Sequence, residues 1–426
     1  FKMAVRNIPR RPAQTVLIIA GLTLSTTIIA AALAIGDTVT NSIRTAVYEG
    51  LGGTDVRVAS PAISVFGDEY LPYSRVDDVR KAVAGDIRVD GVLPEIREIL
   101  AVTLPRTGKT DARAQAVGFE RASLAGFEGA TTESGAEIDL TALGPSETVL
   151  NIDLARKLDA KTGDVIEIVT PSGRTQFIVK AIAQHRGLAG SDPNFLPLLI
   201  PLESLQDALG RKGQINFIDI STAGGQRENV RLSKEVGDDL RLKFTDSAAA
   251  AEIFQALKDP AIIAAIENQA APESSLPPGL KKSLGVLAEE LKKPALTEEF
   301  ETQIAKSTVA GAMLLAVAQA GRSDLSNTLF PAVAKLQVLE VDAIKDRLVD
   351  LAELIGNFVT TFFTIFGSFS IIVGLLLIFL VFVLLAASRT TEMGIARAVG
   401  MKRAHLVQMF MFEGFIYAVV SALIGV

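Results

Sequence analysis

The residues that could perform chemistry are few, and their spacing completes no catalytic motif. Residues 108–110 (glycine, lysine, threonine) resemble the end of a phosphate-binding loop, but the first glycine of that pattern would stand where the chain has Thr103. The glycine-rich segment 50–55 fails the dinucleotide-binding pattern because Asp55 occupies its last glycine position. We interpret the first segment as a polar turn and the second as a flexible exit from a helix.

Nucleophilic and metal chemistry are also unsupported by the residue types present. The chain has no cysteine, and its two histidines are His185 and His405. The flanking charges of the apolar segments predict that these histidines lie on opposite sides of a membrane, so they cannot share a metal or Ser–His–Asp site. Acidic pairs such as Asp77-Asp78 are most simply solvated helix faces. We therefore predict no catalytic residue, no cofactor, no metal and no enzymatic activity.

The composition indicates a membrane protein. Of the 426 residues, 49 % are hydrophobic, and the mean hydropathy is +0.36. The apolar residues concentrate in uncharged runs at both ends, which excludes a purely cytosolic enzyme. The net charge of −6 and the isoelectric point near 5.3 argue against a nucleic-acid partner.

Three segments are long and apolar enough to enter a bilayer. Residues 14–36 carry no charge and would span roughly 34 Å as a helix, enough to cross the hydrocarbon core. Residues 354–388 are also uncharged, and a third apolar run extends from 406 to 426 with Glu413 as its only charge. We predict transmembrane helices at 14–36, 358–387 and 406–426, the last one incomplete. Since the chain does not begin with methionine and stops inside this run, we expect it to be part of a longer protein.

Flanking lysine and arginine predict the orientation. Basic residues dominate 1–13 and 388–405, whereas the segment before the second span is acidic. The positive-inside tendency then places the N-terminus and 388–405 in the cytoplasm and residues 37–357 outside, in the cell (inner) membrane of a multi-pass protein. Residues 1–13 have one apolar helical face and suit a helix lying in the headgroup layer, although a basic anchor without a helix remains an alternative.

Two features within the predicted spans could matter for function or packing. Glu413 is an ionisable group inside a span, which is a functional hypothesis by default. An alternative at least as well supported is that it reaches the cytoplasmic interface near Arg397 or Arg403. Ser370 and Gly374 form a small-xxx-small pair, which permits close membrane packing of helices.

The segment outside the membrane is predicted to contain two parts. Residues 54–245 alternate between strand and helix signals and predict an α+β domain, with strands near 54–58, 112–119 and 215–221, a hairpin over 164–183, and helices at 151–160 and after Pro201. Residues 246–340 are alanine-rich, punctuated by proline, and predict a helical subdomain. Its uncharged stretch 307–321 is interpreted as a buried helix, the alternative being an apolar surface that handles a lipid or lipidated cargo.

Segments on either side of the outer domain predict a stalk. Apolar residues before the second span are spaced three and four apart, which predicts a heptad seam on a helix over 341–357. The segment 37–53 repeats apolar residues every four positions and would pair with it. A simple amphipathic core helix is the alternative. Lys345 is expected on the exposed side. The seam residues are Val341, Ile344, Leu348, Leu351 and Ile355.

Two stretches resemble the FtsX-like permease family of ABC systems, especially its MacB-type members. Residues 2–12, which read KMAVRNIPRRP, are similar to the family's basic entry into the first span. Residues 389–403, which read RTTEMGIARAVGMKR, are similar to its cytoplasmic coupling loop, and this match is the more specific one. The resemblance implies that this loop contacts a separate ATPase through Arg389, Glu392, Met393, Gly394, Arg397, Gly400, Lys402 and Arg403.

The residues of this loop agree with a short helix. Thr390 or Thr391 can cap its start, Gly400 can end it, and Lys402 and Arg403 suit its C-terminal end. The alternative is a plain basic turn. We therefore predict a membrane protein with α-helical transmembrane segments and a large α+β extracytoplasmic domain containing an extra helical subdomain.

The predicted function is that of an ABC permease subunit. It would transmit the motion of a cytoplasmic ABC ATPase through the stalk to the outer domain, for export or extrusion of a lipid, lipoprotein, peptide or small molecule. The rival is a signalling permease that moves no substrate and regulates an external enzyme such as a cell-wall hydrolase; a membrane-anchored adhesion or scaffold protein is a third class. Expected partners are a second permease copy or second module of the same chain, membrane lipid and an envelope protein.

Overall fold

The computed structural model describes residues 12–61, 69–190, 195–224, 229–388 and 390–425. It divides into two compact units, a helical unit comprising Phe1–Arg44 with Leu351–Val426, and a sheet-containing unit comprising Thr45–Asp350. The interfacial helix predicted at the N-terminus lies almost wholly outside the described residues.

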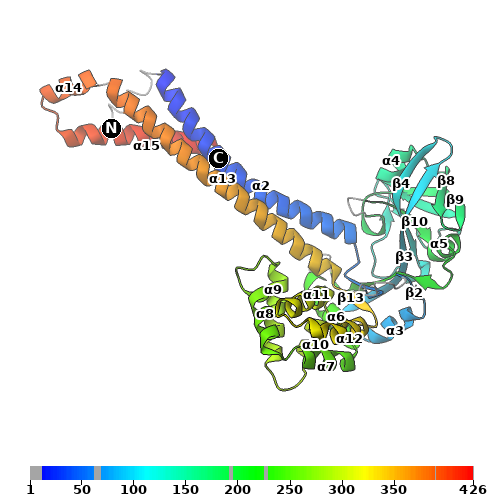
Figure 1. Cartoon of the computed structure of the whole chain (residues 1–426). Helices are drawn as coiled ribbons and strands as arrows, with labels where there is room; N and C mark the ends of the chain where they lie inside the picture. The colour runs from blue at the N-terminus through cyan, green and yellow to red at the C-terminus, as the bar shows by residue number, and fades with distance from the viewer. Residues whose placement is uncertain (1–11, 62–68, 191–194, 225–228, 389, 426) are drawn as a thin grey trace. The chain divides into compact units, whose positions relative to one another are not determined.

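Long helices dominate the helical unit (Figure 1). Helix α2 (Pro12–Leu51) has 40 residues and α13 (Ile344–Ser388) has 45, and each is unbroken. At about 1.5 Å per residue these helices are roughly 60 and 68 Å long, about twice the thickness of a hydrocarbon core. Two further helices follow, α14 (Thr390–Ala398) and α15 (Arg403–Gly425). Among the described residues, the stretch Ile344–Phe366 has the length and hydropathy needed to cross a membrane.

A nine-stranded sheet organises the other unit, in the order β13-β1-β12-β3-β4-β10-β7-β9-β8. The long strand β3 also pairs with β8, so six strands from β3 to β8 close into a ring. Its strands are β1 (Val56–Ala59), β3 (Val89–Leu104), β4 (Lys109–Phe119), β7 (Glu147–Asn151), β8 (Val165–Thr170), β9 (Gly173–Ala183), β10 (Leu196–Pro201), β12 (Phe217–Thr222) and β13 (Glu340–Asp342). Two small sheets pair β2 (Leu71–Pro72) with β11 (Gln214–Ile215) and β5 (Ala130–Thr131) with β6 (Glu137–Ile138).

Local sequence signals are confirmed around this sheet. The predicted hairpin is β8–β9, with Thr170 opposite Gly173 at its turn. Helix α4 (Ile152–Leu158) is capped by Asn151, whose side chain accepts a hydrogen bond from the Asp153 amide. Helix α5 (Leu202–Leu209) follows Pro201 directly and ends at a glycine with positive φ. The unit also contains α3 (Arg75–Ala82) and the short 3-10 turns Arg121–Ser123, Gly187–Ala189 and Ser323–Leu325.

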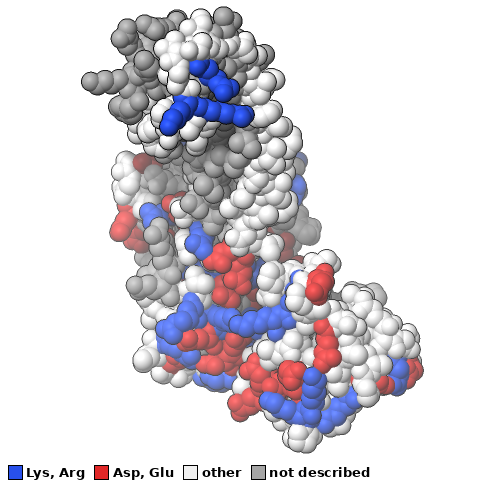
Figure 2. All heavy atoms as spheres, turned by 90° about the vertical axis from the view of Figure 1, so that its left-hand side faces the viewer, with Lys and Arg blue, Asp and Glu red and all other residues white. Residues whose placement is uncertain are grey.

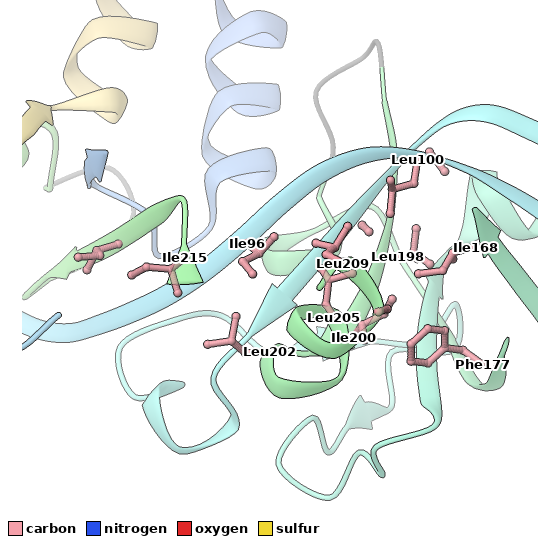
Figure 3. Packing of buried hydrophobic residues seen from close by; sticks show 14 of the residues in the cluster. Ile96, Leu100, Ile168, Phe177, Leu198, Ile200, Leu202, Leu205, Leu209 and Ile215 are labelled. Carbon is pink, nitrogen blue, oxygen red and sulfur yellow. The ribbon is translucent and has the colours of Figure 1, made fainter. Parts of the chain in front are cut away.

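The main core lies between α5 and the closed part of the sheet (Figure 3). Apolar side chains of α5 face residues of β3, β8, β9 and β10. Adjacent strand residues such as Leu198 and Leu199 belong to different clusters, because successive side chains point to opposite faces of a strand. The sheet therefore buries apolar residues on both faces. The labelled core residues are Ile96, Leu100, Ile168, Phe177, Leu198, Ile200, Leu202, Leu205, Leu209 and Ile215.

The predicted helical subdomain has a core of its own. Phe254 and Phe300 pack edge to face with ring centroids 5.0 Å apart. The buried-helix interpretation of 307–321 is confirmed: α11 (Ser307–Gln319) buries Val309 and Met313 among other apolar residues. The other helices of this subdomain are α7 (Ser247–Ala256), α8 (Pro260–Ala270), α9 (Pro278–Leu291), α10 (Glu298–Ile304) and α12 (Ser326–Leu336). Helix α6 (Asn229–Lys243) precedes it and packs Val236 and Leu240 into the core of the sheet.

Acidic and basic side chains alternate over the face of the sheet-containing unit seen in Figure 2. Neither sign of charge forms a large patch on that face. This distribution agrees with the small net charge of −6.

Candidate functional site

The segment predicted to contact an ATPase forms a short helix. Helix α14 (Thr390–Ala398) connects α13 and α15. It ends as expected: Val399 donates its amide proton to the Ile395 carbonyl at 3.0 Å, and Gly400 donates to Arg397 at 3.0 Å with a φ of +99°. The predicted short helix is therefore confirmed for this segment, and the alternative of a plain basic turn is wrong.

The α14 segment presents apolar and basic side chains to its surroundings. Ile395 and Val399 are 61 % and 85 % exposed, and Arg397, Lys402 and Arg403 are exposed as well. Among the described residues, a Cβ built at Gly394 would meet no atom within 4 Å beyond the neighbouring backbone of its own helix. The arrangement is a surface that a partner can approach closely, with apolar contact and positive charge. The predictions for Arg389, for the side chains of Glu392, Met393 and Ser370, and for packing at Gly374 lie outside the described part of the structure.

Side chains connect the helices of the helical unit. Arg44 of α2 forms an ion pair with Glu353 of α13. Ser421 of α15 donates its hydroxyl to the Ile19 carbonyl of α2 at 3.3 Å. The two helices predicted to pair as a stalk are thus in contact at Arg44.

The predicted heptad seam differs from the face that α13 buries. Val341 lies in strand β13, where it pairs with Val58, so the helix begins at Ile344 and not at 341. Leu351 and Ile355 are 47 % and 38 % exposed, whereas the neighbouring Ala352 is fully buried. The spacing of the apolar residues correctly identifies an apolar stripe. Strand pairing of Val341 shortens the helix, however, and the face that α13 buries is adjacent to the predicted seam.

The glycine segment at the end of α2 is a tight junction, so the predicted flexible exit is wrong. A Cβ on Gly52 would lie 2.7 Å from the Gly187 Cα, and one on Gly53 would lie 2.5 Å from the Gly126 carbonyl oxygen. Both positions need glycine because the backbones of three segments touch there. The segment that follows α2 therefore packs tightly, backbone against backbone, on the loops around Gly126 and Gly187 of the sheet-containing unit.

Lys345 stands at the same junction, and its predicted exposure is also wrong. It lies in the first turn of α13 with its side chain only 1 % exposed. Its ammonium forms an ion pair with the Asp55 carboxylate and donates to the Gly52 carbonyl at 3.1 Å. The helix starts inside the sheet-containing unit, which buries the residue that a free stalk helix would expose.

Asp55 connects this ammonium to the sheet. Its carboxylate accepts hydrogen bonds from the amide and the hydroxyl of Thr222, at 2.6 and 2.8 Å. Its carbonyl accepts from the Ser233 hydroxyl at 2.7 Å and from the Lys345 amide at 3.2 Å. Residues of β12, α6 and α13 thus meet on Asp55, directly after the end of α2. We name Gly52, Gly53, Asp55 and Lys345 the helix junction.

A second charged network lies on neighbouring strands. Arg57 of β1 binds Asp219 of β12 through two hydrogen bonds of 2.7 Å, and Arg97 of β3 reaches the same carboxylate at 3.2 Å. Glu95 accepts from Arg97 at 2.7 Å. Although burial alone would raise it, the pKa of Asp219 is held below its ordinary value by Arg57. Burial raises the pKa of Glu95 despite Arg97.

We expect substitution of the two carboxylates to destabilise the fold to very different extents at pH 7. Asp219→Asn leaves Arg57 without its bidentate partner and should cost about 3–5 kcal/mol at pH 7. Because the pKa of Asp219 is lowered, this loss should shrink as the pH falls through the carboxyl range. Glu95→Gln keeps an acceptor for Arg97 and removes a carboxylate whose charged form is disfavoured by burial at pH 7, so it should cost far less. Thermal unfolding of both variants at pH 7 and at lower pH measures this; equal losses at pH 7 would contradict it.

The described residues contain no group of three or more histidine, cysteine or acidic side chains that could hold a metal ion. His185 lies beside Asp153, with 3.4 Å between Nδ1 and Oδ2. Sequence reasoning missed the helix junction. No local signal marked it, because Asp55 is followed by Arg57 and Lys345 stands among other charged residues such as Asp342 and Asp346.

Comparisons with known proteins match both parts of the chain. Residues 15–270 match the family described as the MacB-like periplasmic core domain, and residues 364–426 match the FtsX-like permease C-terminal family. No curated protein sequence matches the chain. Similar solved structures include the periplasmic region of MacB from Actinobacillus actinomycetemcomitans, at 11 % identity and a TM-score of 0.29, covering 43 % of this chain and 83 % of that one. Another is the extracellular domain of the noncanonic ABC-type transporter YknZ from Gram-positive bacteria, at 11 % identity and a TM-score of 0.29. This match covers 43 % of this chain and 88 % of that one.

Proposed function

This chain belongs to the MacB-like periplasmic core domain family and ends in an FtsX-like permease segment, and from that premise we propose that it transmits the motion of a separate cytoplasmic ATPase to its extracytoplasmic domain. Permeases of this family are inner-membrane proteins that work with a cytoplasmic ABC ATPase. In this proposal, residues 14–36, 358–387 and 406–426 cross the membrane, and the outer domain comprises 54–245 with the helical subdomain 246–340.

The unbroken length of α2 and α13 is the observation that carries the proposal. A helix needs about 20 residues to cross a bilayer, so the 40 residues of α2 and the 45 of α13 leave about half of each helix outside it. Within a helix, each backbone hydrogen bond resists bending, and neither helix is interrupted by a turn. A displacement at one end of such a helix is therefore felt at the other.

The input to these helices is the α14 segment. It follows α13 after one intervening residue and precedes α15 by a short turn, so a force on α14 acts on both helices. Its exposed apolar and basic residues suit a groove with acidic side chains on the ATPase. The residues proposed for this contact are those predicted from the sequence: Arg389, Glu392, Met393, Gly394, Arg397, Gly400, Lys402 and Arg403.

The output is mechanical work on a substrate at the outer domain. We propose export or extrusion of a lipid, lipoprotein, peptide or small molecule, with two permease copies or modules working together. Stimulation of the ATPase by such a substrate supports export, and stimulation only by an external hydrolase supports the signalling alternative.

The orientation is tested by cysteine labelling, which is simple because the chain contains no cysteine. Arg174→Cys, on the exposed β8–β9 hairpin, is expected to react with a membrane-impermeant maleimide added to spheroplasts. Arg403→Cys should react only after the membrane is opened. Reaction of both from the same side would contradict the orientation on which the transmission proposal depends.

Hydrogen–deuterium exchange tests transmission itself. The full protein and its ATPase, in lipid nanodiscs, are compared with and without ATP. We expect ATP to change the exchange of residues 390–403 and also of residues 45–61 and 344–350 in the sheet-containing unit. A change confined to the cytoplasmic segment would show that motion stops at the membrane and would overturn the proposed function. An ATPase variant that binds but does not hydrolyse ATP separates binding from turnover.

A further inference from the structure

The helix junction joins the outer ends of both long helices through one side chain. The Lys345 ammonium contacts the carbonyl of Gly52, at the end of α2, and the carboxylate of Asp55, which is bonded to β12. Lys345 itself belongs to the first turn of α13. A single buried group therefore connects α2, α13 and the sheet.

The junction also satisfies backbone groups that helix ends leave free. The last carbonyls of a helix and its first N–H groups have no partner within the helix. Here the Gly52 carbonyl, just past α2, receives the Lys345 ammonium, and the Lys345 amide, at the start of α13, donates to the Asp55 carbonyl at 3.2 Å. The end of α2 is thus capped by a residue of α13, and the start of α13 is capped by a residue that follows α2.

A buried ion pair is an expensive way to hold two elements together. Apolar residues of similar volume often stabilise a fold equally well or better, because they need no removal of charge from water. The hydrophobic effect is non-directional, so apolar burial by itself does not select one register of a helix as sharply as a charged contact does. An ammonium held between a carboxylate and a carbonyl has one preferred position. A shift of α13 by one residue, about 1.5 Å along its axis, would take the buried ammonium away from both acceptors and the Asp55 carboxylate away from its counter-ion.

We propose that Lys345 is a positioning residue, a pin that with Asp55 fixes the ends of α2 and α13 to the sheet so that all three move as one body. This inference rests on the proposed function, for which it supplies the point where helix motion enters the outer domain. The close packing at Gly52 and Gly53 prevents α2 from turning, and the ion pair prevents α13 from sliding.

The test removes the pair without leaving a buried charge. Lys345→Met alone or Asp55→Asn alone leaves one charge without its partner and is expected to destabilise the outer domain strongly. The double variant Lys345→Met/Asp55→Asn removes both charges, and the asparagine side-chain oxygen still accepts from Thr222. The unfolding temperature of this double variant should lie within a few degrees of that of the parent protein. Arg347→Met, on the same helix with 55 % of its side chain exposed, is the matched control.

Distance distributions between two spin labels report whether α13 is fixed. Labels at Asp350→Cys on α13 and Arg174→Cys on the β8–β9 hairpin lie in the same unit, and the chain has no other cysteine. In the full protein in nanodiscs with its ATPase, we expect a narrow distribution for the parent and the Arg347→Met control. In the double variant the distribution should broaden about twofold, because α13 gains freedom to slide and turn. The ATP-dependent exchange change at residues 45–61 should disappear while ATPase binding is retained.

Two results separate this inference from the proposed function. A narrow distribution in a folded double variant, with its ATP response intact, would overturn the pin and leave the proposed function standing. A broadened distribution, together with no ATP response in the parent protein, would overturn the proposed function and leave the fixing role of Lys345 intact.

Discussion

Gly394→Trp is expected to abolish association with the ATPase while leaving membrane insertion and the outer domain unchanged. Within the described part of the structure, no atom beyond the local helix backbone lies within 4 Å of a Cβ at this position, so the fold can accommodate the side chain. A partner that approaches the α14 backbone closely would meet the indole ring first. Co-purification of the ATPase with the permease from detergent-solubilised membranes measures the loss, which should be at least about tenfold, equivalent to about 1.4 kcal/mol.

The matched control is Gly311→Trp. Gly311 lies on α11 of the helical subdomain, and a Cβ there also meets no atom of the described residues within 4 Å beyond the local helix backbone. This variant should bind the ATPase normally, because the same residue is added to open space at a different surface. Arg397→Glu inverts a charge on the α14 segment without adding bulk and should weaken the same association. Normal co-purification of both α14 variants would leave residues 390–403 as a simple connection between helices.

Leu348→Pro is expected to uncouple the outer domain from ATP hydrolysis. Proline in a helix interior removes one backbone hydrogen bond and clashes with the preceding turn, at a cost of about 3 kcal/mol or more. Leu348 is the fifth residue of α13 and belongs to none of the three hydrophobic clusters of the described residues. The outer domain should therefore fold, and the ATPase should bind and hydrolyse ATP. The ATP-dependent exchange change in residues 45–61 should be lost.

The control for this prediction is Leu348→Ala, which removes the same side chain and keeps a good helix former. It should retain most of the ATP response. An alanine substitution at Lys345 is unsuitable as a silent control, because that side chain is buried in the helix junction. If the proline variant inserts, folds and responds to ATP at the normal rate, helix continuity is not the route of transmission, and a route through contacts between the membrane helices would replace it.

Local signals predicted a large part of the fold because their causes lie within a few residues. The β8–β9 hairpin follows from two β-rich runs and a short turn, and the cap of α4 follows from an asparagine two residues before the amide it binds. Gly400 ends α14 because its φ of +99° favours glycine. The position of the α14 segment was likewise predictable, since its motif is contiguous in the sequence.

The helix junction was not predictable in the same way, because its partners are far apart in the chain. Lys345 and the carbonyl of Gly52 are separated by 293 residues, and Asp55 and Thr222 by 167. Only the tertiary structure brings them together. The heptad spacing before the second span has the same limit: periodicity shows that a helix face is apolar, but it carries no information about which neighbour covers that face.

Composition, hydropathy and neighbouring residues are thus enough to predict that the chain enters a membrane and that its outer part is α+β with a helical addition. They also predict that a short helix in a basic segment connects two longer helices. The tertiary structure decided that the glycines after α2 form a close-packed wedge and that Lys345 is buried as an ion pair. The reason is physical: burial and charge pairing are set by which distant segments meet, and strand pairing across the sheet places the start of α13 within reach of the end of α2.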